Sequence, residues 1–139
     1  MEPVLVLSSE SRHLAGILLL ALVTVETGGR YLLKIITRNV AVTPFQTSFA
    51  RAGHAHAGVL LILALLCQVF ADATSQTGFL DWLSRSGVAI AALLMSGGFF
   101  FSSMGEGREH PNRLIALVFA GGALLAVSLV SLGVGLLTA

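Results

Sequence analysis

The chain has 139 residues, of which 55% are hydrophobic and only 11% are charged. Soluble domains carry about 25% charged residues, so this composition excludes an ordinary water-soluble globule and also a disordered chain. The net charge of +1 and the lack of a basic block argue against nucleic acid as a partner. The single cysteine, Cys67, excludes an internal disulfide framework. The sequence therefore indicates an integral membrane protein, with residues 1–139 forming one domain.

Four stretches are apolar enough to cross the ~30 Å hydrocarbon core of a bilayer as helices. We expect them at about residues 13–36, 48–70, 82–104 and 114–139. Because the hydrophobic runs are continuous and do not alternate with polar residues, a β-barrel is excluded. Pro111 is placed to begin the fourth helix. The predicted fold class is an all-α bundle of four transmembrane helices in the lipid bilayer.

The distribution of lysine and arginine predicts the orientation of the chain in the membrane. The side with the first and third loops carries five of these residues: Lys34, Arg38, Arg51, Arg108 and Arg113. The side with both termini and the middle loop carries two, Arg12 and Arg85, with acidic residues that include Glu2. We therefore expect a multi-pass protein of the cell (inner) membrane whose first and third loops are cytoplasmic.

Two ionisable residues lie inside the first predicted span, where such residues are costly and usually functional. Glu26 and Arg30 are spaced i, i+4 with the acid first, which is the favourable order for a helical pair. Both lie roughly 9–15 Å from the predicted cytoplasmic side. Either the pair neutralises itself so that the helix can insert, or Arg30 faces an anionic group such as a carboxylate of a cofactor.

Two histidines, His54 and His56, lie at a similar depth in the second predicted span. Residues two apart on a helix differ by roughly 200°, so a regular helix cannot direct both imidazoles at one metal. We expect one to face the interior, as a hydrogen-bonded core residue or a metal ligand, and the other to face a neighbouring group. The small residues Gly53, Ala57 and Gly58 permit close helix packing or leave room for a flat ligand.

The end of the third predicted span adds two serines and three aromatic rings to the same depth: Ser102, Ser103, Phe99, Phe100 and Phe101. The rings either line a pocket or face lipid. The opposite half of the membrane offers little polarity beyond three residues: Thr24, Cys67 and Gln68. No nucleophilic motif and no pair of carboxylates is placed for acid–base chemistry, so any catalysis requires a cofactor.

The stretch Ala50-Arg51-Ala52-Gly53-His54-Ala55-His56-Ala57-Gly58 resembles the styrene-oxide isomerase family. The run Gly97-Gly98-Phe99-Phe100-Phe101-Ser102 does so too, as does, more faintly, Pro111-Asn112-Arg113. The likeness covers roughly the second to fourth helices. That family consists of four-helix membrane proteins that form homotrimers and bind haem b. Their ferric haem acts as a Lewis acid that rearranges an epoxide to an aldehyde.

The resemblance implies roles for the residues of the polar layer. His56 is the implied iron ligand, because His56-Ala57-Gly58 keeps the His-x-Gly spacing of the family, and His54 is its rival. Around the ring, the resemblance implies small residues that admit it, aromatic walls and a cation for the propionates: Gly53, Ala57, Gly58, Phe99, Phe100, Phe101, and Arg30 or Arg51. Ile62 and Phe99 stand where the family has a polar asparagine and tyrosine, so no catalytic residue is assigned.

These observations predict a haem-dependent epoxide isomerase with a small apolar substrate, and two alternatives stay open. One is a haem protein without that activity, such as a redox carrier, a gas binder or a haem-handling module. The other is a non-catalytic helper subunit whose polar layer locks helices together or passes protons. One axial protein ligand leaves the opposite iron position open for a substrate or gas in the first two cases.

Overall fold

The computed structural model describes residues 6–37 and 40–139. Four long helices follow one another: α1 (Ser9–Ile36), α2 (Pro44–Ala71), α3 (Gly78–Ser103) and α4 (Ala116–Leu137), the last preceded by the 3₁₀ turn η1 (Arg113–Ile115). The described residues contain no strand. Each helix, with η1 counted as part of the fourth, is long and apolar enough to cross a membrane. The predicted all-α membrane protein with four helices is thereby confirmed.

Capping residues set where the helices begin. The first three helices start at residues 9, 44 and 78, ahead of the predicted starts at 13, 48 and 82. Ser8 accepts a hydrogen bond from the Ser11 N–H, and Thr43 forms a capping box ahead of Pro44. At the fourth helix the expectation for Pro111 is wrong, because the Asn112 side chain accepts the Leu114 N–H and caps η1.

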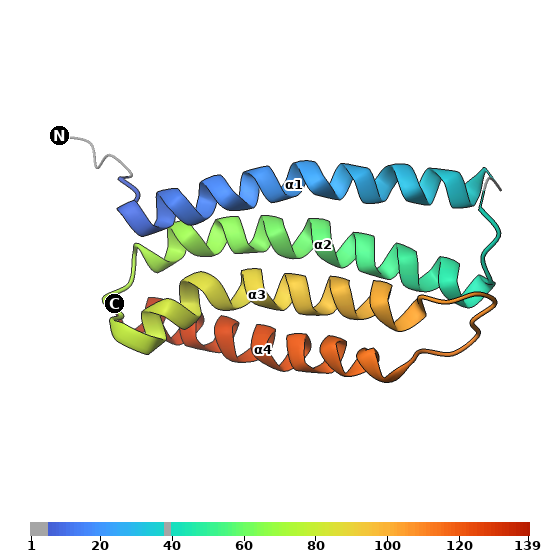
Figure 1. The fold of residues 1–139 in the computed structure, drawn as a ribbon. Coiled ribbons are helices and arrows are strands. Elements are labelled where there is room, and N and C mark those ends of the chain that lie inside the picture. Colours follow the sequence, from blue (N-terminus) through green and yellow to red (C-terminus); the bar gives the residue numbers. More distant parts are fainter. Residues whose placement is uncertain (1–5, 38–39) are drawn as a thin grey trace.

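The four helices lie in a row in chain order, as Figure 1 shows. α1 packs on α2, α2 on α3, and α3 on α4, whereas among the described residues α1 and α4 do not contact each other. α1 therefore has one main neighbour, and its buried residues are only Ser11, Leu18 and Ile35. The outward faces are apolar, with Leu20 and Phe119 more than two-thirds exposed, which is compatible with contact to lipid.

The core lies mainly between α2, α3 and α4. Its buried members come from all four helices: Leu18, Leu60, Leu61, Ala64, Cys67, Ala71, Val88, Ala92 and Leu132. Glycines bring α3 and α4 close together. A Cβ on Gly87 would overlap the Ser128 hydroxyl, and a Cβ on Gly98 would lie 2.7 Å from Val118 Cγ2. Such small residues let membrane helices approach closely and gain dispersion energy.

Candidate functional site

His56 lies in the middle of α2 beside an apolar groove. Its Nδ1 is 2.7 Å from the Ala52 carbonyl oxygen, one turn earlier in the helix. A carbonyl oxygen only accepts hydrogen bonds, so Nδ1 must carry the proton. In the neutral ring Nε2 then has a free lone pair, and it has no hydrogen-bond partner among the described residues. An imidazole held in this way is oriented to bind a metal through Nε2.

The groove beside His56 has a volume of about 310 Å³ and lies between three helices. Apart from His56 its lining is apolar, with small and branched side chains from α2, one methionine from α3 and one leucine from α4: Ala55, Val59, Leu60, Met95 and Leu125. A Cβ on Gly58 would meet nothing within 4 Å, but Gly58 is two positions from His56 and lies on the opposite side of α2. The space that the His56 imidazole lines is therefore apolar, and Gly58 is not part of it.

His54 faces a different neighbour, as the two-residue spacing predicts. Its ring packs on α1, where a Cβ on Gly28 would lie 3.2 Å from His54 Nδ1 and a Cβ on Gly29 would lie 3.5 Å from Cε1. His56 instead contacts Phe99 of α3, with the two ring centres 4.9 Å apart. The two histidines therefore do not share a site, and His54 would have to leave its glycine contacts to bind iron.

The three phenylalanines at the end of α3 point in different directions. Phe99 packs edge-on against Phe49, at 5.4 Å between ring centres, and also against His56. Phe99 and Phe100 together fill the space over Gly53, where a Cβ would lie 2.9 Å from a Phe100 ring carbon. Phe101 is half exposed. The space at Gly53 is therefore occupied by the protein's own rings, and of the three only Phe99 contacts His56.

The remaining members of the predicted polar layer do not converge on His56. Glu26, Arg30 and Arg51 are exposed, and every ion pair within 4.0 Å among the described residues involves Arg85. Glu26 and Arg30 thus do not form the expected self-neutralising pair. The buried Ser102 and Ser103 hydroxyls donate to carbonyls of their own helix. The residues of the predicted polar layer therefore lie in separate surroundings and do not form one site.

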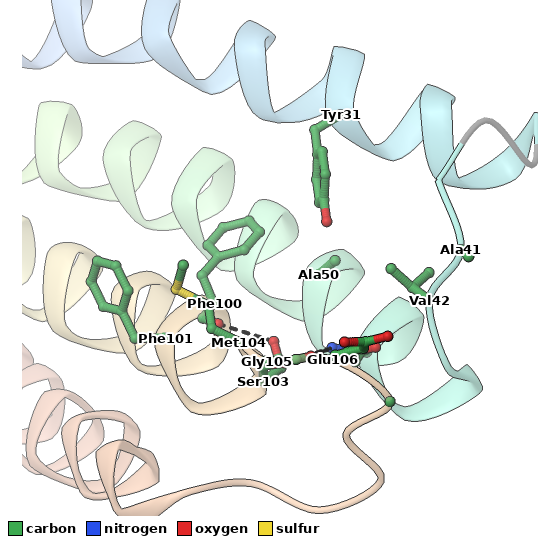
Figure 2. Close-up of a pocket in the computed structure, with 12 residues that line it drawn as sticks. Tyr31, Ala41, Val42, Ala50, Phe100, Phe101, Ser103, Met104, Gly105 and Glu106 are labelled. Carbon is green, nitrogen blue, oxygen red and sulfur yellow. Dashed lines mark hydrogen bonds between the residues drawn. The ribbon is translucent and has the colours of Figure 1, made fainter.

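A second cavity, of about 460 Å³, lies at the loop end of the molecule. Figure 2 shows Tyr31 extending from α1 into this space and Phe100 pointing toward it from α3, while the Phe101 ring turns to the side. The Tyr31 hydroxyl has no hydrogen-bond partner among residues 6–37 and 40–139. The cavity is also lined by Glu106 and Gln46. The Gln46 side-chain amide donates to the Ser103 carbonyl at 2.9 Å and to the Gly105 carbonyl at 2.7 Å. This cavity and the groove of His56 share no lining residue.

A second polar cluster lies at the other end of the molecule, where α1 begins and α2 ends. Arg85 of α3, whose side chain is 11% exposed, donates to Asp72 at 2.5 Å, to Asp81 at 2.8 Å and to the Ser11 hydroxyl at 2.6 Å. The Ser8 N–H donates to Asp72 at 2.8 Å. We call these residues, Ser8, Ser11, Asp72, Asp81 and Arg85, the Arg85 cluster. The sequence analysis did not predict this cluster, although the i, i+4 spacing of Asp81 and Arg85 is a signal that could have found it.

The Arg85 cluster joins segments that are far apart in the chain. It holds the start of α1 to the α2–α3 turn, and the Ser11 hydroxyl also donates to the Gln68 carbonyl at 3.1 Å. Burial raises the pKa of Asp72, but hydrogen bonds from Arg85 and Ser8 lower it more, leaving it at about 2. Removing one partner would leave another charge of the cluster unpaired, which is destabilising, so we interpret the cluster as structural and not as a reactive site.

Comparisons with known proteins add no assignment. No protein-family model, no curated protein and no solved structure matches this chain. The geometry of the groove beside His56 is therefore the evidence on which a function can be argued.

Proposed function

We propose that this chain is a membrane protein that binds haem b, with His56 as the axial ligand of the iron. The observation that carries the proposal is the 2.7 Å contact between His56 Nδ1 and the Ala52 carbonyl oxygen. It leaves the Nε2 lone pair available at an apolar groove, which is the arrangement that an axial imidazole requires. The resemblance of the sequence around His56 to styrene-oxide isomerases supports the same residue.

The surroundings of His56 fit a porphyrin in several respects. Ala55 is exposed and lines the groove beside His56, and the Phe99 ring lies 4.9 Å from the imidazole between ring centres. Arg51, one and a half turns earlier on α2, is exposed and forms no ion pair with the described residues, so it is available to a propionate. Arg30 lies on another helix and belongs to the outward face of α1.

The reaction implied by the resemblance is the isomerisation of an epoxide to a carbonyl compound, for which bound ferric haem supplies a Lewis acid. The residues of this chain would bind the substrate by apolar contact alone. Ile62 and Phe99 have hydrocarbon side chains, so neither offers a hydrogen bond to orient an epoxide. This observation favours a second candidate, a membrane haem protein that handles electrons, gas or haem itself.

The absorption spectrum of the protein purified in mild detergent, after expression with adequate haem supply, tests the proposal. We expect a Soret band that disappears in His56→Ala and persists in His54→Ala. His13→Ala is the matched control, because His13 Nδ1 makes the same 2.7 Å contact with a carbonyl one turn earlier, outside the groove. A colourless wild-type protein contradicts haem binding and favours the helper subunit.

Two further measurements separate the candidate activities. A five-coordinate spectrum together with turnover of a styrene-oxide-like epoxide supports the isomerase. A low-spin spectrum with two axial protein ligands points to electron transfer and contradicts the open position that the isomerase needs. An unchanged Soret band in His56→Ala, lost instead in His54→Ala, would transfer the ligand role to His54.

We also propose that the first and third loops face the cytoplasm of the cell (inner) membrane. Lys34, Arg51, Arg108 and Arg113 support this orientation, and the predicted contribution of Arg38 lies outside the described residues, as does that of Glu2. The opposite side carries only Arg12 and Arg85. The excess of lysine and arginine therefore lies with the first and third loops, as the positive-inside rule requires of cytoplasmic loops.

A further inference from the structure

The cavity of about 460 Å³ at the loop end of the molecule has no role in the function proposed so far. It is the space into which Tyr31 extends in Figure 2. Small-molecule sites have volumes of roughly 300–1,000 Å³ and combine apolar walls with a few polar groups. The walls of this cavity include the apolar side chains of Val42, Ala50, Phe100 and Met104. The cavity therefore has the size and the lining of a ligand site.

The charge of the lining favours a cation as the ligand. Glu106 is the one charged side chain among the described lining residues, and it forms no ion pair with the part of the chain that the structure describes. Arg108 is close in sequence but does not line the cavity, and its Nε donates to the Met104 carbonyl at 2.8 Å. An anion in the cavity would face the carboxylate with no lining cation, whereas a cation would neutralise Glu106.

The loop that carries Glu106 is held in place on both sides of this residue. The two glycines that flank it adopt positive φ angles of 123° and 59°, which glycine tolerates without strain. The Gln46 side-chain amide donates to the Gly105 carbonyl at 2.7 Å. The Thr43 hydroxyl donates to the Arg108 carbonyl at 2.5 Å. The carboxylate is therefore presented by a fixed backbone, and binding requires little ordering of the loop.

Two aromatic residues add the groups that an organic cation requires. Figure 2 shows Tyr31 extending into the cavity from α1 and Phe100 pointing toward it from α3. Aromatic faces attract ammonium groups, including quaternary ones. The Tyr31 hydroxyl, which has no hydrogen-bond partner among residues 6–37 and 40–139, can pair with a polar group of the ligand.

A metal cation fits these groups poorly. Ca²⁺ takes about six to eight oxygen ligands. Here the Gln46 side-chain oxygen already accepts the Thr43 N–H at 3.1 Å, and the Ser103 hydroxyl donates to the Phe100 carbonyl at 3.0 Å. Among the described residues, no group of three histidine, cysteine or acidic side chains can hold a metal ion. An organic cation needs one counter-charge and apolar contacts, and it matches the lining better.

We propose that this cavity binds a small organic ammonium cation, with Glu106 as its counter-charge and Tyr31 and Phe100 as its aromatic walls. The cavity shares no lining residue with the groove of His56, so the proposal goes beyond haem binding and does not depend on it. A free cation suits the site better than the ammonium of a lipid headgroup. The headgroup phosphate would bring a negative charge close to Glu106, with no lining cation to receive it.

Choline and its uncharged isostere 3,3-dimethylbutan-1-ol test the proposal, because they differ only in the charged nitrogen. Tyr31 is the only tyrosine of the chain, so labelling with fluorotyrosine gives one fluorine NMR signal that reports on the cavity. We expect choline to shift this signal saturably in the full-length protein in detergent, and the isostere to bind at least tenfold more weakly. The quaternary nitrogen has no lone pair, so choline cannot act as an iron ligand. An unshifted signal, or equal binding of the two compounds, would overturn the proposal.

A pair of matched variants tests the counter-charge. Glu106→Gln should lose at least tenfold in choline affinity, whereas Glu109→Gln, in the same loop but outside the cavity lining, should bind as the wild type does. Both side chains are exposed, so neither substitution disturbs the core. Equal losses in the two variants would show attraction to the loop in general and would overturn the site. Phosphocholine that binds as tightly as choline would overturn the assignment to a free cation and indicate a lipid headgroup.

Discussion

At the scale of single residues, the neighbours of each side chain decide its chemistry. His54 and His56 are two positions apart, yet one ring packs on the glycines of α1 while the other binds a carbonyl of its own helix through Nδ1. Sequence spacing predicted that they face different directions. It could not predict which nitrogen carries a proton, because that depends on the orientation of the ring relative to the Ala52 carbonyl.

Asp72 gives a residue-scale prediction about pH. Its pKa of about 2 is below the ordinary value of about 3.9, so its contribution to stability is present above pH ~4 and is lost as the pH falls towards 2. We expect Asp72→Asn to be less stable than the wild type at pH 6, with the difference narrowing towards pH 2. Thermal unfolding in detergent, followed by circular dichroism, measures it. A constant difference between the two proteins over this range would contradict the assigned cause.

At the scale of helices, hydrophobicity predicted the spans but not their ends. A hydropathy window responds to apolar composition, whereas a helix begins where a side chain can satisfy its first N–H groups. Ser8 and Thr43 perform this role outside the apolar runs, so the helices extend beyond the predicted spans. The small residues of α3 were visible in the sequence, but their partners on α4 were not.

The packing of α3 on α4 gives a prediction at the same scale. Gly87→Ala places a methyl group against the Ser128 hydroxyl, and we expect a loss of about 1–3 kcal/mol in the free energy of unfolding. Gly122→Ala on α4 is the control, since its Cβ would meet nothing within 4 Å. Its stability should stay equal or rise slightly, because alanine is the better helix former. Equal destabilisation by both substitutions would show that the close approach at Gly87 is unimportant.

At the scale of the whole molecule, the sequence predicted the helix count but not the arrangement. The Arg85 cluster depends on contacts between residues more than 60 positions apart, such as Ser8 with Asp72. In the sequence, Arg85 was counted only as one of the charges that predict the orientation of the chain. Only the fold reveals that Asp72 and Ser11 reach the same guanidinium.

The Arg85 cluster should control how firmly α1 is attached to the rest of the protein. α1 has few buried residues, and its first turn is bound through Ser8 and Ser11. Breaking a buried ion pair from one side costs about 3–5 kcal/mol, because the remaining charge is left unpaired. In Arg85→Met we expect amide hydrogen exchange to rise at least tenfold in the first half of α1, while the centres of α3 and α4 remain protected. As a control, Arg113→Met should leave amide hydrogen exchange unchanged in both regions. If exchange in Arg85→Met instead rises uniformly across all four helices, the cluster supports the whole fold and not the docking of α1.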